Sequence, residues 1–460
     1  MKHMEMTVRF ITEACGGRLL SGDPEAAVTS VSADSRGIKE GALFVPIVGE
    51  KTDAHRFIPD VFKAGAAASF TQEPSKDYGE KAVILVKDTL RALQDTAAAY
   101  RRAFHIPFIG VTGSAGKTTT REMTALALSS GLNVMKTQGN LNSQVGLPLT
   151  LFTLSARHEA AVMEMGMSNF GEMGRLAGIA RPDFAVITNI GLSHIGQLKT
   201  KENILKEKLH ITDFFGRSST LFLNGDDSML AALKGSLPFD TVYYGTGENS
   251  AFRAVNIEES SNSSKFQFIP EGGAGVSVTL PVPGRHYISD ALAALAVCSR
   301  LNVPLGKAAA ALSSYSPLAM RQQVLDVNGI TVIDDSYNSS PDALNGSLDV
   351  LAGFRGGRRI AVLADMLELG GLSRRAHYEA GAYAARAGID GVIAIGDYAA
   401  DIIRGARSVL PSMHCGVSAG NTEAEAALKN LLRHGDTVLV KGSRGMHTDE
   451  IVKWLKKTYS

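Results

Sequence analysis

Cysteine is scarce in this chain of 460 residues, which contains only Cys15, Cys298 and Cys415. The three positions lie far apart, so the sequence excludes a disulfide framework and a CxxC metal site, and it fits a reducing cytoplasm. No apolar run reaches the roughly 18 residues that a membrane-spanning helix needs. The first residues, MKHMEMTVRFITEACGG, also lack the apolar segment and small-residue cleavage site of a signal peptide. We therefore expect a cytoplasmic protein without a membrane span.

An excess of either charge is absent as well. The chain has 47 Lys and Arg residues against 46 Asp and Glu residues, which gives a formal net charge of +1. A nucleic acid is therefore not the expected partner, because binding its backbone requires clustered cationic charge. One focused pocket for a small anion needs no such excess. Hydrophobic residues make up 45% of the chain and charged residues 20%, which excludes disorder along its whole length.

The length and the alternating pattern of the sequence predict three α/β domains. At about 150 residues per domain, this chain would hold roughly three. Residues 1–84 contain short β-rich runs separated by Gly and Asp, which predict a small α/β domain. In residues 85–314, strand-like runs alternate with helical segments, which predicts parallel strands with helices on both faces. Residues 315–460 repeat this alternation and predict a doubly wound, Rossmann-like sheet, but no GxGxxG run indicates bound NAD or FAD.

The strongest local motif is a glycine-rich turn between a strand-like run and a helical segment, at residues 110–119, GVTGSAGKTT. Gly113 and Gly116 would let backbone N–H groups curl around phosphate oxygens, and the helix N-terminus favours the negative charge. Lys117 would neutralise the β- and γ-phosphates of a nucleotide. Val111 stands where the strict P-loop has glycine. The alternative is a strand–turn–helix unit whose glycines only permit tight packing.

A nucleotide site of this kind also needs ligands for a metal ion. Within the turn, the Thr118 hydroxyl would reach Mg²⁺. Glu164 directly follows an apolar run, and His194 follows the strand-like run that ends near residue 188, so both are candidate ligands. Taken singly, Glu164 could equally be a solvated charge at a strand end, and His194 a hydrogen-bonded loop residue.

Together, the motifs resemble one family over nearly the whole chain, the Mur ligases of peptidoglycan precursor synthesis. The shortened loop of that family, TGxxGKT, stands here at residues 112–118, which accounts for Val111. Residues 139–143 (GNLNS) resemble the GNxN segment of the family. Other segments resemble the branch that adds D-alanyl-D-alanine. They are residues 164–172 (EMGMSNFGE), 334–341 (DDSYNSSP), 365–370 (DMLELG) and 441–444 (KGSR).

The resemblance implies an ATP-dependent amide ligase. The carboxylate of UDP-MurNAc-tripeptide would take the γ-phosphoryl group of ATP and become an acyl phosphate, which supplies the leaving group that a free carboxylate lacks. The amine of D-alanyl-D-alanine would then attack and release phosphate. Cations must offset the repulsion between carboxylate and triphosphate, and Mg²⁺ supplies most of that charge. The resemblance makes Glu164 and His194 magnesium ligands, and a monomer is expected.

A lysine is also implied to be chemically modified. Lys208 is similar to the lysine that the family carbamylates with carbon dioxide, which would turn a cation into an anionic metal ligand. Lys206 is the competing assignment. Spacing alone gives a different prediction, because Glu202 and Lys206 would form an i,i+4 ion pair on a solvated helix face that also carries Lys208. The implied catalytic residues are thus Lys117, Glu164, His194 and Lys208.

The resemblance further assigns two substrate sites. The residues implied to bind ATP are Thr112, Gly113, Ser114, Ala115, Gly116, Lys117, Thr118, Thr119, Asp290, Arg321, Asp335, Tyr337 and Asn338. The residues implied to bind the UDP-sugar are Ser35, Arg36, Asp53, His55, Asn140 and Asn142. Without the resemblance, these residues have equally simple interpretations. Arg321 could be an exposed charge in a loop, Asp335 could cap the helix that follows, and residues 34–36 could form a plain turn between strands.

The chain departs from the family pattern at residues 284–290, GRHYISD, where Tyr287 and Asp290 replace two amides that help to bind adenine. An ionised aspartate accepts hydrogen bonds but cannot donate them. A family member that adds a single amino acid would carry an Asp-Asn-Pro-Arg run, which is absent here. A folylpolyglutamate synthetase would have Ala-His-Asn at residues 336–338, which read SYN. A non-catalytic binding module of the same fold would not need the full catalytic set.

Overall fold

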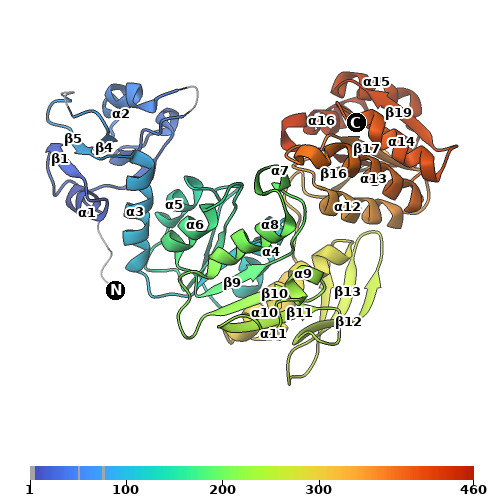
Figure 1. The fold of residues 1–460 in the computed structure, drawn as a ribbon, viewed down its shortest axis with the longest axis horizontal. Helices are drawn as coiled ribbons and strands as arrows, with labels where there is room; N and C mark the ends of the chain where they lie inside the picture. The colour runs from blue at the N-terminus through green and yellow to red at the C-terminus, as the bar shows by residue number, and fades with distance from the viewer. Residues whose placement is uncertain (1–5, 50–51, 75–77, 460) are drawn as a thin grey trace.

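The computed structural model describes residues 6–49, 52–74 and 78–459. It has three lobes, each built around one β-sheet, and the N-terminal and C-terminal lobes lie at opposite ends of the central lobe (Figure 1). This agrees with the α/β class and the three-part organisation predicted from the sequence. Within the described part of the chain, no helix is both long and apolar enough to cross a membrane.

The N-terminal lobe has a five-stranded sheet in the order β1-β5-β4-β3-β2, in which only β1 runs antiparallel to its neighbour. The strands are β1 (Arg18–Ser21), β2 (Ser30–Ser32), β3 (Ala42–Phe44), β4 (Ala68–Thr71) and β5 (Ala82–Leu85). The helices are α1 (Val8–Ala14) and α2 (Ile58–Lys63), with short 3₁₀ turns η1 (Ser35–Gly37) and η2 (Ala54–Phe57).

The central lobe has a nine-stranded sheet in the order β14-β13-β12-β11-β10-β9-β6-β8-β7. The strands are β6 (Phe108–Thr112), β7 (Val134–Lys136), β8 (Ala160–Glu164), β9 (Phe184–Ile187), β10 (Thr220–Asn224), β11 (Asp240–Gly245), β12 (Phe252–Glu259), β13 (Ser264–Ile269) and β14 (Val276–Leu280). The helices are α4 (Lys117–Leu128), α5 (Gly146–Leu151), α6 (Glu172–Ala180), α7 (Ile195–Leu198), α8 (Lys201–Leu209), α9 (Ser228–Ala231), α10 (Arg285–Arg300) and α11 (Leu305–Leu312), with the 3₁₀ turn η3 (His210–Thr212).

The central sheet corrects the expectation of parallel strands throughout. Strands β12, β13 and β14 pair antiparallel at one edge. The connections between them span only residues 260–263 and 270–275. Such short links can join antiparallel strands, whereas a parallel pair needs a crossover of a dozen or more residues. The remaining strands are parallel and covered on both faces. For example, Phe108 of β6 belongs to the core around α5 and α6, while Ile109 and Val111 belong to the core around α4 and α10.

The C-terminal lobe has a six-stranded sheet in the order β15-β16-β20-β17-β18-β19, parallel except for β15, which agrees with the predicted doubly wound pattern. The strands are β15 (Gln323–Val327), β16 (Ile330–Asp335), β17 (Arg359–Ala364), β18 (Gly391–Ile395), β19 (His414–Ser418) and β20 (Thr437–Lys441). The helices are α12 (Pro341–Gly353), α13 (Ser373–Arg386), α14 (Ala399–Val409), α15 (Asn421–Leu431) and α16 (Asp449–Tyr459), with the 3₁₀ turns η4 (Gly370–Leu372) and η5 (Arg444–Met446).

Helix α3 (Thr89–Arg102) joins the N-terminal lobe to the central lobe. Asp88 caps it by accepting a hydrogen bond from Arg91 N, as expected for an N-cap aspartate. Its first half packs into the N-terminal core through Leu93, and its second half packs into the central core through Tyr100. The predicted boundary after residue 84 lies one residue before the end of β5.

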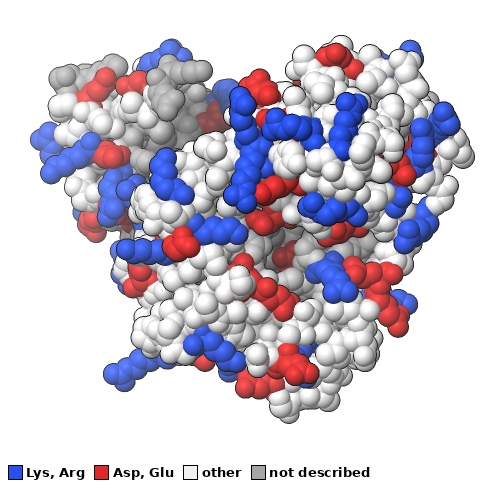
Figure 2. Space-filling model, turned by 45° about the vertical axis from the view of Figure 1, so that its right-hand side comes forward, with Lys and Arg blue, Asp and Glu red and all other residues white. Residues whose placement is uncertain are grey.

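Charged side chains of both signs are interspersed over the face shown in Figure 2, as the net charge of +1 leads one to expect. The same face is hollowed near its centre, between the C-terminal lobe and the central lobe. The carboxyl ends of parallel strands are where open α/β sheets bind their ligands. Strands β6, β8 and β9 of the central lobe end at the motifs singled out in the sequence, so this is where a functional site is expected.

Candidate active site

The glycine-rich turn has the predicted strand–turn–helix geometry, since it leaves β6 and opens α4 at Lys117. Gly116 has φ 79° and forms the N-terminal boundary of the helix. Gly113 has φ 153°, and a Cβ atom there would lie 1.8 Å from the Thr188 hydroxyl oxygen. Only glycine fits at Gly113 for both reasons, so the turn can keep its backbone N–H groups available for phosphate.

The loop after β9 holds this turn in place. Asn189 accepts from Ser114 N through its backbone carbonyl (3.1 Å) and from Ala115 N through its side-chain Oδ1 (2.9 Å). The Thr188 hydroxyl donates to the Ala115 carbonyl at 2.5 Å. Sequence reasoning did not single out Thr188 or Asn189. Their position could have indicated this role, because both residues directly follow β9, the strand that neighbours β6 in the sheet.

Lys117 curls back over the turn. Its ammonium donates to the carbonyl of Gly113 at 2.9 Å and lies 3.4 Å from that of Ser114. Burial lowers the pKa of the Lys117 ammonium, Glu164 raises it, and Arg321 lowers it again. The structure therefore brings Lys117 near both a candidate metal ligand of the central lobe and a candidate phosphate ligand of the C-terminal lobe.

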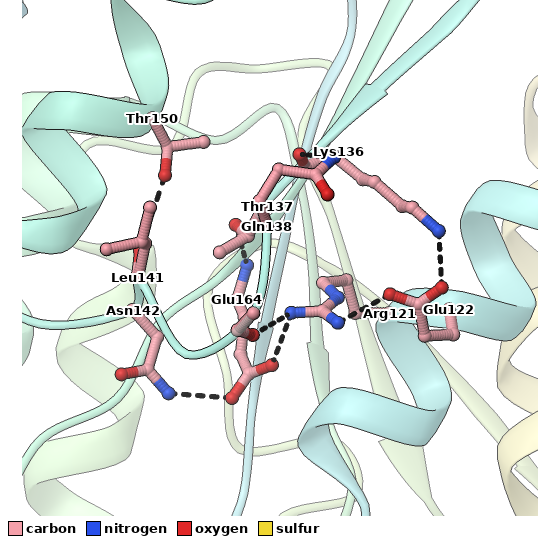
Figure 3. Close-up of polar contacts among 10 residues, drawn as sticks. Arg121, Glu122, Lys136, Thr137, Gln138, Leu141, Asn142, Thr150 and Glu164 are labelled. Carbon is pink, nitrogen blue, oxygen red and sulfur yellow. Dashed lines mark hydrogen bonds and ion pairs between the residues drawn. The ribbon is translucent and has the colours of Figure 1, made fainter. Parts of the chain in front are cut away.

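Glu164 ends β8 and is only 2% exposed, so it is not the solvated strand-end charge that its position alone allowed. One carboxylate oxygen accepts from Asn142 Nδ2 at 2.7 Å, and the other accepts from Arg121 Nη1 at 3.1 Å (Figure 3). The Thr137 hydroxyl accepts a hydrogen bond from Glu164 N at 2.9 Å. The carboxylate is thereby held between Arg121 of α4 and Asn142 of the 139–143 loop.

Lys208 lies on α8 and is 2% exposed, whereas Lys206 is exposed. The solvated helix face predicted from spacing is therefore wrong for Lys208. The expected ion pair between Glu202 and Lys206 is also not found among the described residues. Burial and the nearby Lys117 ammonium hold the pKa of Lys208 well below its ordinary value, and Glu207 partly opposes them.

His194 lies at the contact between the central and C-terminal lobes. It has φ 63°, and its Nδ1 lies 2.6 Å from Glu368 Oε2, in close polar contact. This contact lowers the pKa of the Glu368 carboxyl. Nearby, Leu192 N donates to Asp342 Oδ2 at 3.3 Å. Glu368 lies within the 365–370 segment singled out in the sequence, but nothing there indicated its contact with His194, and Asp342 lies outside every such segment.

The C-terminal residues implied to bind ATP form one cluster. The Arg321 guanidinium lies over the Tyr337 ring, 3.9 Å from its centroid. Asp335 accepts from Lys441 Nζ at 2.5 Å, and the same ammonium donates to the Asn338 carbonyl at 3.0 Å. Asp335 is not the cap of the following helix, which starts after Ser340 without a side-chain cap.

Asp290 lies directly behind the glycine-rich turn. Its Oδ1 accepts from the Thr120 hydroxyl at 2.5 Å, and a Cβ atom at Gly116 would lie 2.9 Å from it. Burial raises the pKa of Asp290 from 3.8 to about 7, against the Thr120 hydrogen bond, which lowers it. Tyr287 uses its hydroxyl to bond the Arg321 carbonyl at 3.3 Å. The two residues that depart from the family pattern thus support the turn and Arg321.

Asp290→Asn is expected to stabilise the protein more at about pH 8 than at about pH 5. The pKa of Asp290 is about 7 in the folded protein and 3.8 in the unfolded chain. The free energy of unfolding of wild type therefore falls as the pH rises from 3.8 to about 7, and the whole cost of burying the ionised carboxylate is present above that range. Asparagine can still accept the hydrogen bond from Thr120. The Tyr244, Tyr287 and Tyr315 side chains face Asp290, but burial raises the pKa of each phenol further above the pH range of this test. Urea unfolding at both pH values measures this, and an equal effect at both would contradict it.

The N-terminal residues implied to bind the UDP-sugar lie on two turns. Arg36 is exposed and pairs with Asp34 at 2.7 Å, next to Ser35 on η1. His55 is 3% exposed. Its Nδ1 is hydrogen-bonded to Asp53 Oδ1 at 2.6 Å, and its Nε2 accepts a hydrogen bond from Gln72 N at 3.2 Å. His55 therefore has both ring nitrogens engaged inside its own lobe, and no hydrogen bond between described residues joins it to Asn140 or Asn142 of the central lobe.

The side chains around the turn fit magnesium in their chemistry. Across the described ranges, no three His, Cys, Asp or Glu side chains converge as a ready metal cage. Magnesium, however, keeps several waters and binds through one or two carboxylates plus substrate phosphates. Glu164 offers a carboxylate, Thr118 a hydroxyl and His194 an imidazole. Lys208 would add an oxygen ligand only as a carbamate.

Comparison with known proteins gives the same family for every lobe. Residues 27–101 match the model described as "Mur ligase family, catalytic domain", residues 111–298 the "Mur ligase middle domain" and residues 320–444 the "Mur ligase, glutamate ligase domain". The UDP-N-acetylmuramoyl-tripeptide--D-alanyl-D-alanine ligase of Bacillus subtilis is 36% identical over 454 residues, covering 98% of each chain.

Solved structures agree along the whole chain. A MurF crystal structure from Acinetobacter baumannii covers 100% of both chains with a TM-score of 0.92 at 28% identity. The MurF ligase of Thermotoga maritima, solved in complex with ADP, covers 94% of this chain and 97% of its own, with a TM-score of 0.82 at 27% identity. The chain therefore belongs to the Mur ligase family and, within it, to the MurF type.

Proposed function

We propose that this chain is the ATP-dependent ligase that joins D-alanyl-D-alanine to UDP-MurNAc-tripeptide, the last step in making the UDP-MurNAc-pentapeptide precursor of peptidoglycan. The observation that carries the proposal is the match to the Bacillus subtilis ligase over 98% of both chains. Lys117 also lies within electrostatic reach of both Glu164 and Lys208, which supports their joint role in ligase chemistry. We place the reaction in the cytoplasm, where ATP is available, and expect a monomer.

The proposed reaction proceeds in two transfers. A carboxylate oxygen of the tripeptide attacks the γ-phosphorus of ATP, and ADP leaves. The amine of the dipeptide then attacks the acyl carbon, loses a proton, and releases inorganic phosphate as the amide forms. Lys117 and Arg321 are the cations placed to offset the repulsion between carboxylate and triphosphate. The Gly113–Gly116 turn would hold the phosphates through backbone N–H groups.

Glu164, His194 and Thr118 would hold magnesium, together with Lys208 once it is carbamylated. Bound there, magnesium would neutralise charge on the phosphates and on the developing acyl phosphate. Lys208 suits the modification because carbamylation needs a neutral amine, and burial beside Lys117 favours that form. The neighbouring Glu207 ties α8 to the start of α6 by accepting from Gly171 N and Met173 N, at 3.0 Å each.

The proposed substrate sites extend to both outer lobes. The UDP-sugar would lie between the N-terminal residues Ser35, Arg36 and Asp53 and the central residues Asn140 and Asn142. Asn140 is exposed and free to reach a ligand, whereas Asn142 already holds Glu164. His55 would act on this site only indirectly, by fixing the Asp53 turn.

The reaction itself gives the first test. Purified protein should release phosphate from ATP only when UDP-MurNAc-tripeptide, D-alanyl-D-alanine and Mg²⁺ are all present, with tripeptides ending in diaminopimelate or in lysine tried in parallel. Omitting each component in turn is the control. Turnover with a single amino acid and none with the dipeptide would identify a ligase of another branch. If no donor gives turnover, the chain is instead a non-catalytic binding module of the same fold.

A further inference from the structure

A buried arginine lies beside the proposed site and has no part in the chemistry described so far. Arg121 is on α4, one helical turn after Lys117, and is only 1% exposed. It is among the largest fully buried side chains in the described part of the protein. A guanidinium stays charged at all physiological pH values, so burying it is costly unless it is paired and hydrogen-bonded. The hydrogen-bond partners of the Arg121 guanidinium therefore indicate its role.

Arg121 joins three segments of the central lobe (Figure 3). Its Nη1 donates to the Gly139 carbonyl at 2.8 Å and to Glu164 Oε2 at 3.1 Å. Its Nη2 donates to Glu122 Oε1 at 2.5 Å, and Glu122 in turn pairs with Lys136 on β7. One terminal nitrogen of the guanidinium, Nη2, is thus held by Glu122, while the other, Nη1, is directed at Glu164.

The same carboxylate and the same loop are also tied to each other. Asn142, three residues after Gly139, donates to the second oxygen of Glu164 at 2.7 Å, and Gly166 N donates to the Asn142 carbonyl at 2.9 Å. Arg121 therefore closes a triangle between the nucleotide-binding helix, the carboxylate at the end of β8 and the 139–143 loop. Each side of the triangle consists of hydrogen bonds between buried or partly buried groups.

We propose that Arg121 is a positioning residue, which orients Glu164 toward the metal and holds the 139–143 loop in its substrate-binding conformation. The inference rests on the proposed function for the roles of Glu164 and of this loop. The guanidinium suits this task because its planar fork donates in several fixed directions at once, whereas a lysine ammonium on a flexible stem does not reproduce them. Mutation of a group that orients a metal ligand typically lowers metal affinity or activity by about 10- to 100-fold.

The test compares Arg121→Lys with Arg101→Lys. Arg101 is a matched control, since it is another buried arginine that bonds carbonyls away from the site, at Ala180, Phe104 and Arg181. Amide hydrogen exchange on the free proteins is the first readout. Arg121→Lys should speed exchange in the 139–146 region by about tenfold or more, with little change in the other strands of the central sheet. Arg101→Lys should leave this region unchanged.

The second readout is the Mg²⁺ concentration that gives half-maximal turnover, which Arg121→Lys should raise by about tenfold or more and Arg101→Lys should not. If Arg121→Lys does not fold, Glu122→Gln should shift both readouts in the same direction by a smaller factor. Unchanged loop exchange and Mg²⁺ dependence in folded Arg121→Lys would overturn the proposal and leave a purely structural arginine. Faster loop exchange in a protein that shows no ligase activity would instead count against the proposed function alone.

Discussion

Lys117→Ala is expected to lower turnover by about 10²–10³-fold while the protein stays folded, because removing one preorganised charge contact at a transition state costs about that much. The ammonium donates to the Gly113 carbonyl of the phosphate-binding turn and lies near Glu164 and Arg321, so it is placed beside the groups that would surround a triphosphate. Steady-state phosphate release at saturating substrates measures the effect.

The control for this experiment is Lys265→Ala, which removes an exposed lysine from β13 at the edge of the central sheet. It should keep wild-type turnover. Circular dichroism should show that Lys117→Ala retains its secondary structure, since Thr188 and Asn189 hold the turn through hydrogen bonds that do not involve the lysine. A folded Lys117→Ala variant within threefold of wild type would remove Lys117 from the mechanism.

Lys208→Ala should lose most activity, while Lys206→Ala should keep most of it. The two lysines lie on the same helix, but only Lys208 is buried, and it lies beside Lys117. A free ammonium next to Mg²⁺ would be repelled, whereas a carbamate would be attracted and would complete the ligand set. Phosphate release by the two variants, assayed under the same conditions, measures the contrast.

Chemical rescue separates a lost ligand from a damaged fold. A short carboxylate such as acetate should restore part of the activity of Lys208→Ala, since it can supply an anion in the vacated space. The same addition should not help Lys117→Ala, which lacks a cation. If Lys206→Ala is the inactive variant and Lys208→Ala is active, the modified lysine is assigned two residues too late on α8.

Most of the fold could be predicted because strands and turns depend on neighbouring residues. The apolar run at residues 107–112 and the glycines after it predict a strand and a tight turn, and β6 and α4 lie where expected. The antiparallel edge of the central sheet was missed. Its strands β12 to β14 alternate buried and exposed residues over short lengths, and such a pattern does not reveal which strand each one pairs with.

The candidate site was predictable only in part. Lys117, Glu164 and Lys208 could be named from motifs, but the sequence around Lys208 indicates a solvated helix face. The burial of Lys208 comes from the packing of α8 in the central lobe, which its neighbours in the sequence do not specify. Arg121 gave no signal, and the 365–370 motif that contains Glu368 did not indicate its contact with His194. Each acts on a residue from another segment, and contacts of that kind leave no local pattern.

The sequence by itself determined the α/β class, the phosphate-binding turn and the family, because each depends on residue types at short, fixed spacings. The tertiary structure alone decided that Glu164 is clamped between Arg121 and Asn142, and that His194 meets a carboxylate of the C-terminal lobe. The physical reason is that charge, hydrogen bonding and burial depend on distance in space. Packing brings together side chains that lie far apart along the chain, and only then is it decided which of them exclude water and become partners.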